Sequence, residues 1–452
     1  MMEEIQNMSV LSPEIHQIMK ELQREIQAIG EEIWQHPETG YRETRTSHFL
    51  AECFSALGLP VRTGLAMTGL RADLDTGRPG PTIALVGELD ALYQPGHPAA
   101  DKKNGAAHSC GHHTHAAAIW GAAAALRRPE VLSQLSGRIV FIAAPAEEGI
   151  ESDYRRELIK AGKIGSFCGK SQLIREGVFD DVDIALMNHI GTNDYGTNNA
   201  NGFIAKRITF LGNAAHASYP YRGCNALNAM DLARHAIALL RESASAKDPS
   251  ARIHGIITSG GSAVNTLPGT VTMEYMLRSS QVNELQDLAS RFDQAVRYSA
   301  AAMETGIRIE SVHGAMPLDN SDALAETARR IIAELAPEAP FHYQTGQDYG
   351  STDMGDVSQL MPVLHLEVRG SNGGLHRDYF ALADVVAAYA GNAEILAQMA
   401  FVLLSEEAVE ARKIIQASPG KMSREEYLKV VDAFSKTIFL PREEVEVKLQ
   451  NG

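Results

Sequence analysis

Apolar residues recur at helical spacing near the start of the chain. Between residues 13 and 30 they stand three or four positions apart, at Ile15, Ile18, Met19, Leu22, Ile26 and Ile29. This period predicts an amphipathic helix over residues 13–30. A second helix is predicted over residues 44–57, because Gly58 and Pro60 end the pattern there.

Short apolar runs then alternate with helical segments. Strands are predicted over residues 69–74, 82–86, 138–144 and 182–187, with a helix over residues 114–127. This alternation predicts an α/β fold, in which helices cover both faces of a sheet. Chemistry in such sheets gathers at the strand ends. Just beyond a predicted strand stand Asp90, Glu147, Glu148 and His189.

The pattern changes near residue 200. Strands are predicted over residues 205–211, 252–259, 270–278 and 306–312, and helices over residues 224–243 and 282–303. The order β-α-β-β-α-β is that of a ferredoxin-like unit. We therefore expect an inserted lid domain, residues 200–312, between two parts of a catalytic domain, residues 1–199 and 313–452. The second part ends in a charged, helix-prone C-terminal extension from about residue 405.

Composition narrows the class of protein. A chain of 452 residues is too long for one ordinary core, so two domains are expected. The net charge of −15 argues against nucleic acid or an anionic membrane as a partner. The N-terminus carries Glu3, Glu4 and Glu14 and does not read as a signal peptide, and no run of about 18 apolar residues predicts a membrane span. Four cysteines without a disulfide framework favour the cytoplasm.

The densest chemistry lies in residues 108–115, His-Ser-Cys-Gly-His-His-Thr-His. Thiolate and imidazole groups are ligands for a zinc-like ion. A loop containing Gly111 can turn both Cys110 and His112 inward. A lone cysteine is more often a small buried apolar residue, but among so many histidines metal ligation by Cys110 and His112 is favoured. Supporting or packing roles are as well founded as catalytic ones for His108, His113 and His115.

Two adjacent carboxylates, Glu147 and Glu148, end an apolar run. They repel each other unless a cation or a shared proton relieves them. One could bind a metal while the other moves protons, although a solvated loop start is the simpler interpretation. His189 and His376, each taken alone, would more often be ordinary hydrogen-bonding residues. His216 lies in the lid and could reach a substrate only if the lid closes over the site.

Taken together, these motifs carry a family resemblance. The chain resembles the metal-dependent amidohydrolases and peptidases grouped with aminoacylase and carboxypeptidase G. Within them it is most similar to the branch of p-aminobenzoyl-glutamate hydrolase, indole-3-acetyl-amino-acid hydrolase and a β-alanyl-lysine type dipeptidase. The resemblance covers about residues 20–400, and its specificity lies in the order and spacing of the motifs. These motifs are residues 87–92, 108–112, 145–149, 189, 215–218, 265–268, 351–356 and 375–376.

The resemblance implies a paired metal site and a role for each matching residue. The implied ligands are Cys110, His112, Glu148, His189 and His376. They would hold two divalent ions, zinc in the first place, with manganese or cobalt as alternatives. Glu147 takes the general-base position, His216 polarises the scissile carbonyl, and Asp90 orients a ligand. Asn265 and Arg278 match lid positions that hold a substrate carboxylate or stabilise charge.

The implied function is hydrolysis of the amide bond of an N-acyl or aryl-amido amino acid, by a homodimer that pairs through the lid. A β-alanyl-lysine type dipeptidase is the alternative. A non-catalytic metal-binding scaffold is less favoured because the ligand set and Glu147 are both present, and redox chemistry at Cys110 lacks a second cysteine nearby in sequence. The chain departs from the family at His113, at residues 93–107 and at residues 151–175. These segments are expected to border the substrate pocket.

Overall fold

Two compact units make up the computed structural model, which describes residues 11–442 except 193 and 419. Unit 1 consists of Met1–Asn198, Asp319–Gly346 and Asp356–Arg424. Unit 2 consists of Asn199–Leu318, Gln347–Gly355 and Glu425–Gly452. Each unit is therefore assembled from segments that are distant in the sequence.

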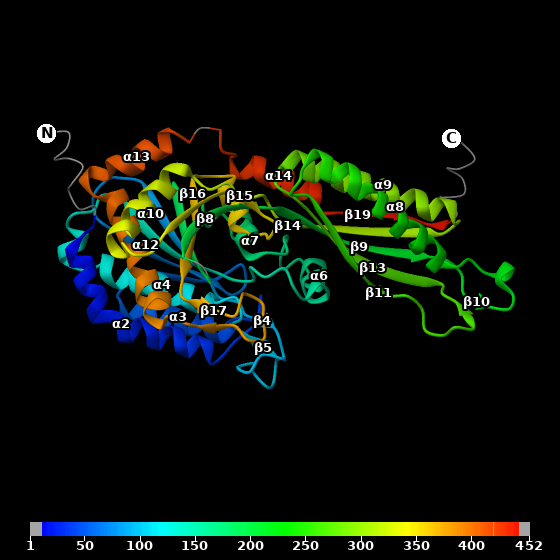
Figure 1. The fold of residues 1–452 in the computed structure, drawn as a ribbon, viewed down its shortest axis with the longest axis horizontal. Coiled ribbons are helices and arrows are strands. Elements are labelled where there is room, and N and C mark those ends of the chain that lie inside the picture. Colours follow the sequence, from blue (N-terminus) through cyan, green and yellow to red (C-terminus); the bar gives the residue numbers. More distant parts are fainter. Residues whose placement is uncertain (1–10, 193, 419, 443–452) are drawn as a thin grey trace. The chain divides into compact units, whose positions relative to one another are not determined.

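Unit 1 is organised around an eight-stranded sheet (Figure 1). Its strands, in order across the sheet, are β1 (Val61–Leu65), β2 (Gly69–Asp75), β6 (Arg138–Ala144), β3 (Thr82–Glu88), β7 (Ile184–Gly191), β16 (Val363–Arg369), β8 (Tyr195–Ala200) and β15 (Phe341–Asp348). The central strands β6, β3, β7 and β16 pair in parallel. Every residue of β3 is buried, as expected for a parallel strand that is covered on both faces. The predicted α/β fold is confirmed.

Helices cover this sheet. The longer ones are α2 (Pro13–Trp34), α3 (Thr44–Ala56), α4 (His112–Leu126), α10 (Asp322–Leu335) and α12 (Asn392–Leu404). Helix α2 begins where the Ser12 side chain accepts a hydrogen bond from the Ile15 amide, and Pro13 occupies the first position, where no amide donor is needed. Helix α4 is buried at every position and packs between the sheet, α2 and α12. The Ala-rich sequence of α4 permits this close packing.

One described helical segment is long and apolar enough to cross a membrane. It is Ala387–Leu404, which joins the π-helical turn η2 (Ala387–Gly391) to α12, and 72% of it is buried inside the structure. The sequence pattern predicted no such segment, because Asn392 and Glu394 interrupt the apolar run. Since the segment packs against α2 and α4, it is a core helix of unit 1.

Shorter elements connect these parts. They are β4 (Leu92–Tyr93), β5 (Ala106–Ala107), α5 (Pro129–Leu132), α6 (Ser152–Lys160), α7 (Gly169–Arg175), α11 (Met354–Ser358), β17 (Ser371–Asn372), β18 (Ala381–Leu382), η3 (Glu406–Ala408) and α13 (Val409–Gln416). Residues 93–107 and 151–175, the two segments that are expected to border the substrate pocket, thus contain the β4–β5 hairpin and the helices α6 and α7.

Unit 2 is an antiparallel sheet with two helices. Across the sheet its strands are β11 (Arg252–Ser259), β13 (Thr270–Ser279), β9 (Gly202–Leu211), β14 (Gly306–Ala315) and β19 (Lys436–Leu440). Its other elements are β10 (Ala215–His216), η1 (Pro220–Arg222), α8 (Ala226–Lys247), β12 (Thr266–Leu267) and α9 (Val282–Ala302). Residues of β13 alternate between buried and half-buried, because α8 and α9 pack on one face of the sheet. The main elements follow each other in β-α-β-β-α-β order.

The C-terminal segment joins unit 2. We expected residues 313–452 to belong with the larger domain, but the described residues after Arg424 lie in unit 2. After α14 (Arg424–Phe434), strand β19 pairs antiparallel with β14, from Ile307 opposite Leu440 to Ser311 opposite Lys436. An open strand edge readily accepts a further strand. The sequence pattern suggested only helix here because β19 is five residues long.

Candidate metal centre

Strand ends in unit 1 position the expected site residues. Asp90 follows β3, Glu147 and Glu148 follow β6, and His189 lies within β7, two residues before its end. Because these strands run in parallel, their carboxyl ends meet at one edge of the sheet. Helix α4 begins at His112 rather than at the predicted residue 114, so His112 and His115 lie on one helix face.

A glycine permits the turn between the first two expected ligands. Gly111 has φ of +83°, a left-handed conformation that other residues rarely adopt. A Cβ atom at this position would lie only 2.2 Å from Cγ2 of Ile190. The Cys-Gly-His sequence is therefore required by the backbone as well as by its side chains.

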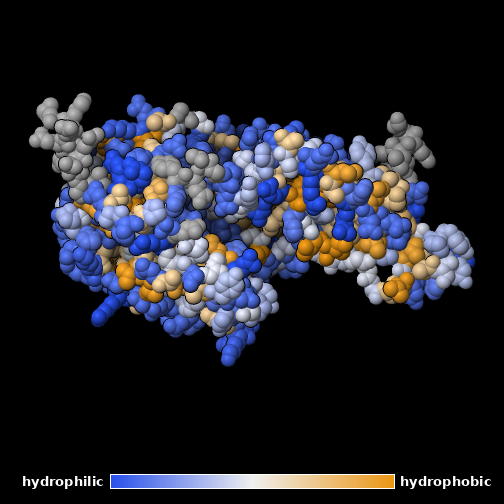
Figure 2. Space-filling view, in the orientation of Figure 1, coloured by the Kyte–Doolittle hydropathy of each residue, from blue (hydrophilic) through white to orange (hydrophobic). Residues whose placement is uncertain are grey.

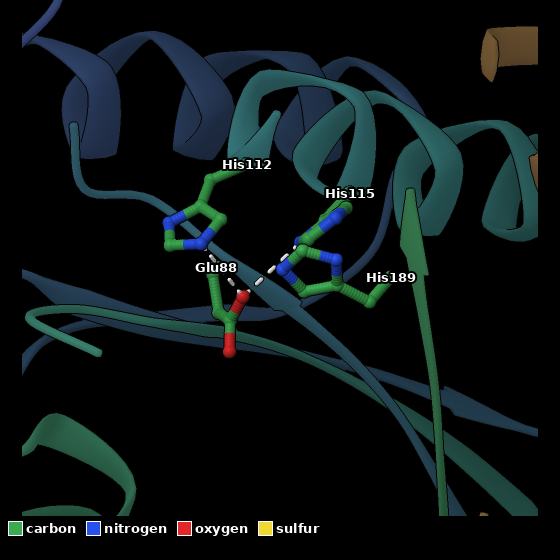
Figure 3. Close-up of side chains that lie close together, drawn as sticks. All are labelled: Glu88, His112, His115 and His189. Atoms are coloured by element: carbon green, nitrogen blue, oxygen red, sulfur yellow. Dashed lines mark hydrogen bonds and ion pairs between the residues drawn. The ribbon is translucent and has the colours of Figure 1, made fainter. Parts of the chain in front are cut away.

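The structure brings all five expected ligands together (Figure 3 shows two of them, His112 and His189). The Cys110 Sγ atom lies 3.5 Å from His189 Nε2 and 3.3 Å from His376 Nε2. His376 Nε2 is also 3.0 Å from Glu148 Oε1. One ligand atom each from His112, Glu147 and Glu148 lie within 4.8 Å of one another.

Asp90 contacts two of these residues. His112 Nδ1 lies 2.8 Å from the Asp90 backbone oxygen and 3.1 Å from its Oδ1, and both atoms are acceptors. The other carboxylate oxygen, Oδ2, accepts a hydrogen bond from the Glu148 amide at 3.0 Å. Asp90 therefore fixes the ring of His112 and the backbone of Glu148, as a residue that orients ligands would.

The thiol and the imidazoles shift each other's titration. Burial by itself would raise the pKa of the Cys110 thiol, but the His112 and His189 imidazoles beside it bring that pKa well below its usual range. Burial would lower the pKa of His112, yet the Glu88 and Cys110 anions raise it well above its usual value. The site thus favours a thiolate, which is the form of cysteine that binds metal.

The glutamate and histidine at the other side behave similarly. Burial, together with the negative Cys110, raises the pKa of Glu148 to about 7. A hydrogen bond to Cys110, together with the Glu148 carboxylate beside the ring, raises the pKa of His376 to about 11. Anions are concentrated here, and they stabilise any cation placed among them.

The donor set fits a divalent metal. Within the described residues, His112 Nε2 and Glu148 Oε1 are buried but make no hydrogen bond of acceptable geometry. Both lie among sulfur, nitrogen and oxygen atoms at about the spacing found between ligands of one ion. Buried ligand atoms that make no hydrogen bond, in a cluster of thiolate, imidazole and carboxylate groups, suit zinc and its neighbours in the first transition row.

Glu147 differs from Glu148 in its surroundings. The Glu147 side chain is half-buried, while that of Glu148 is buried. A carboxylate that remains accessible beside a buried ligand cluster can exchange protons with a substrate or with water. This contrast agrees with the division of roles expected for the Glu-Glu pair.

The three expected lid residues lie in unit 2. His216 is exposed, and its Nδ1 accepts a hydrogen bond from the Ser218 amide at 3.1 Å. The Asn265 backbone oxygen accepts from the Ala217 amide at 2.8 Å, so Asn265 lies beside His216. Arg278 is fixed elsewhere in the unit by donating to Ser351 Oγ at 2.8 Å.

Four further residues belong to this cluster or contact its members. Sequence reasoning left the role of His115 open between support, packing and catalysis, and it gave the other three no role. Glu88 and Lys170 form a fully buried ion pair, and His115 Nδ1 lies 3.2 Å from Glu88 Oε2. Arg155 is also buried and donates to the backbone oxygens of Ala146, Phe167 and Glu148. The three-residue spacing of His112 and His115 was a usable signal for His115, but Arg155 and Lys170 lie in a segment without a motif.

The other histidines of the motif pack away from the ligand atoms. His113 lies against the Trp34 ring, with centroids 4.8 Å apart, and His108 lies 5.3 Å from His113. Burial lowers the pKa of His108 to about 3 and that of His113 well below its usual value, so both are neutral. Of the two roles considered for them, the geometry favours packing.

Comparison with known proteins places this arrangement in a family. The sequence profile of peptidase family M20/M25/M40 matches residues 70–400. An N-acetyl-L-cysteine deacetylase of Bacillus subtilis is 26% identical over 73% of this chain and 77% of its own length. One component of the p-aminobenzoyl-glutamate hydrolase of Escherichia coli is 28% identical over 82% of this chain and 76% of its own length. A human Xaa-Arg dipeptidase is 29% identical over 79% of each chain.

The fold agrees with a solved structure of the same family. The Bacillus subtilis YXEP protein, described as a dinuclear metal binding peptidase, matches with a TM-score of 0.64 and 18% identity, covering 86% of this chain and all of that one. The family profile spans well over half of the chain. The chain therefore belongs to peptidase family M20/M25/M40, a family of hydrolases that act on amide bonds.

Proposed function

We propose that this protein is a metal-dependent amidohydrolase that cleaves the amide bond of an N-acyl or aryl-amido amino acid. The observation that carries the proposal is the convergence of Cys110, His376 and Glu148 atoms at 3.3 Å and 3.0 Å, beside the accessible Glu147. The deacetylase and the p-aminobenzoyl-glutamate hydrolase among the relatives support this substrate class.

Two divalent ions are proposed to occupy the centre, zinc in the first place, with manganese or cobalt as alternatives. The ligands would be Cys110, His112, Glu148, His189 and His376. When bound, such ions supply Lewis-acid activation of water and of the amide carbonyl. The description of the Bacillus subtilis structure as dinuclear supports the number of ions.

Glu147 is assigned the proton transfers. Its carboxylate accepts the proton of the attacking water and returns it to the departing amine, a task that suits an accessible group beside the ligands. Asp90 keeps the His112 ring in place through the contacts at its Nδ1 atom.

Residues of unit 2 would complete the site. Because His216 Nδ1 accepts from the Ser218 amide, its Nε2 carries the proton and can donate to the developing oxyanion. Asn265 and Arg278 would hold the substrate carboxylate.

A panel of amides tests the proposal. The full chain, reconstituted with zinc, manganese or cobalt, is offered N-acetyl amino acids, p-aminobenzoyl-glutamate and dipeptides that include β-alanyl-lysine. We expect release of amino acid from the first two classes. Preference for the dipeptides would instead support the alternative dipeptidase, which the human Xaa-Arg dipeptidase relative makes worth including. Absence of any hydrolysis with metal bound would favour a scaffold protein.

A homodimer formed through unit 2 is also proposed. Strand β11 lies at one edge of the unit 2 sheet and exposes Ile256 and Ile257, which are 59% and 43% exposed. Figure 2 shows apolar surface gathered along this unit. Strand β19 already covers the opposite edge at β14, so pairing at β11 would bury the open edge of the described sheet.

Mixing two inactive chains tests whether the dimer shares its sites. A His216→Ala chain and a Glu147→Gln chain, each inactive alone, are mixed in equal amounts. If His216 serves the partner, the mixture should regain about a quarter of wild-type activity, because about half of the dimers are mixed and one of the two sites in each is complete. Mass in solution gives the oligomeric state independently. A fully active monomer would contradict the dimer, and mixed dimers without activity would contradict the shared site.

A cytoplasmic location completes the proposal. No disulfide joins any of the four cysteines, so the Cys110 thiol is available as a ligand. A reducing compartment keeps thiols in this state. Fractionation of cells that produce the full chain should recover it with cytoplasmic markers, and recovery with secreted proteins would contradict this.

A further inference from the structure

A buried carboxylate lies next to the expected ligands without a role in the proposed reaction. Glu88, the last residue of β3, is fully buried, and its carboxylate lies between the rings of His112 and His115 (Figure 3). Taking a carboxylate out of water is costly unless nearby cations and donors compensate it. The groups around each of its two oxygens therefore indicate why it is there.

The Oε1 atom is held by a buried ammonium group. Lys170 Nζ lies 2.5 Å from Glu88 Oε1, and Lys170 is fully buried as well. Lys170 is the second residue of α7. A Cβ atom at the preceding Gly169 would lie 1.7 Å from the Pro145 backbone oxygen, so α7 packs directly against the strand end that leads to Glu147.

The Oε2 atom accepts a proton from His115. The Ile190 amide donates to His115 Nε2 at 3.2 Å, which leaves the His115 proton on Nδ1. That Nδ1 lies 3.2 Å from Glu88 Oε2 and donates to it. Both nitrogens of His115 are thus occupied, and His115 supports Glu88 rather than offering a free ligand atom.

The remaining contact of Oε2 is with the second ring nitrogen of His112. Because His112 Nδ1 faces two acceptor atoms of Asp90, a neutral ring, which is the form that binds metal, carries its proton on Nδ1 and presents a lone pair at Nε2. That Nε2 lies 3.2 Å from Glu88 Oε2 and makes no hydrogen bond of acceptable geometry among the described residues. Two lone pairs at this distance repel each other unless a cation lies between them.

The same spacing separates the expected ligands from one another. Cys110 Sγ lies 3.3 Å from His376 Nε2, and Glu148 Oε1 lies 3.0 Å from the same nitrogen. One ligand atom each from Glu88, His112, His115 and His189 also lie within 4.8 Å of one another. The distance between Glu88 and His112 is therefore similar to the distances among the other expected ligands.

We propose that Glu88 is a further metal ligand, which binds through Oε2 and is held in place by Lys170 and His115. The inference rests on the proposed function, because it requires a divalent ion at His112. It makes Lys170 a positioning residue, whose ammonium group keeps the Glu88 carboxylate ionised and aimed at the ion. The rival interpretation is a proton on His112 Nε2, which would make the contact an ordinary ion pair.

Cobalt binding to the purified full chain separates these interpretations. Glu88→Gln keeps the shape of the side chain but removes the anionic ligand. We expect one of two cobalt ions to bind at least about 10-fold more weakly, with a changed visible absorption. The thiolate-to-cobalt band of Cys110 should remain. Glu157→Gln, on the exposed face of α6, is the matched control and should bind cobalt as the wild type does.

Lysine variants test the positioning role. Lys170→Met should weaken the binding of the same cobalt ion. Lys170→Arg should retain part of the cobalt affinity because it keeps the positive charge. Lys163→Met, at an exposed lysine of the same segment, should change nothing. An effect of Lys170→Met on folding alone, with wild-type cobalt affinity and absorption in the folded protein, would contradict this role.

The outcomes distinguish this inference from the proposed function. A wild-type chain that binds no cobalt would overturn both. A wild type and a Glu88→Gln variant that bind two ions equally, with identical spectra, would overturn only the role of Glu88. If Glu88→Gln does not fold, a crystal structure of the cobalt-loaded wild type decides. An oxygen–metal distance of about 2.0–2.2 Å supports ligation, and one beyond about 3 Å contradicts it.

Discussion

Arg155 offers a direct test of what holds the Glu147–Glu148 loop. Its guanidinium group is buried and donates to the backbone oxygens of Ala146, Phe167 and Glu148. Ala146 has a positive φ of 53°, so this loop has a strained conformation that needs such support. Replacing Arg155 by methionine keeps the apolar stem and removes every donor.

The contacts set the size of the effect. A hydrogen bond from a charged donor contributes about 1.5–3 kcal/mol, so three such bonds contribute about 4.5–9 kcal/mol. The Ala146 and Glu148 oxygens each keep an amide donor, from Gly169 and Ile150. The loss expected for Arg155→Met is therefore near or below the bottom of this range, about 3–5 kcal/mol. With a urea slope of about 2.5–3 kcal/mol per molar, the midpoint should fall by about 1–2 M.

Tryptophan fluorescence reports on the relevant unit alone. The chain has two tryptophans, Trp34 and Trp120, and both lie in unit 1 with Arg155. Urea unfolding followed at these residues therefore measures unit 1, even if unit 2 unfolds separately. Cobalt affinity of the same samples then shows whether a displaced loop also weakens the metal centre.

Two results would refute this reasoning. A midpoint for Arg155→Met within about 0.3 M of the wild type, less than about 1 kcal/mol at that slope, would mean that the loop holds itself. Arg62 is an exposed arginine in β1. If Arg62→Met lowered the urea midpoint as much as Arg155→Met does, the effect would not be specific to the buried site. The urea midpoint of Arg155→Lys should lie between those of the wild type and Arg155→Met, because one ammonium group cannot reach all three acceptors as the guanidinium group does.

Two further predictions concern unit 1. Burial and the charge of Asp90 raise the pKa of Glu43 to about 8 from 4.5. The unfolded chain therefore loses this proton first, and the stability that Glu43 contributes falls as pH rises from about 4.5 to 8. Urea midpoints at several pH values should show a flatter decline for Glu43→Gln, and parallel curves would contradict this. Gly111→Ala should weaken cobalt binding because of its positive φ and its contact with Ile190, and Ile190→Ala should restore part of it in the double variant. Additive losses would argue against that contact.

The sequence pattern was most informative where burial is complete. The continuous apolar run of β3 and the regular spacing of α2 predicted their elements because each packs on a core by its own side chains. Strand β19 could not be found in this way, since it is stabilised by its pairing with β14 rather than by a pattern of its own. The start of α4 was placed two residues late, because the polar residues His112 and His113 are buried by the site and not by the core.

Sequence motifs predicted the ligand cluster, but they did not predict the buried residues that hold it in place. Cys110, Glu148 and His376 were expected together and lie together. Arg155 and Lys170 were missed because their partners are backbone oxygens and a carboxylate distant in sequence. A single buried cation leaves no periodic signal, and its purpose appears only when the fold brings its partners near.

Bound metal and turnover, measured together in two glutamine variants, test the central claim most directly. Glu147→Gln should hold as much metal as the wild type and lose about 10²–10⁴-fold in turnover of the best amide substrate. Glu148→Gln should instead lose metal, since its carboxylate is the buried ligand. Exchange of the two phenotypes, or near-normal turnover by metal-loaded Glu147→Gln, would contradict the assignment of this centre as an amide-hydrolysing site.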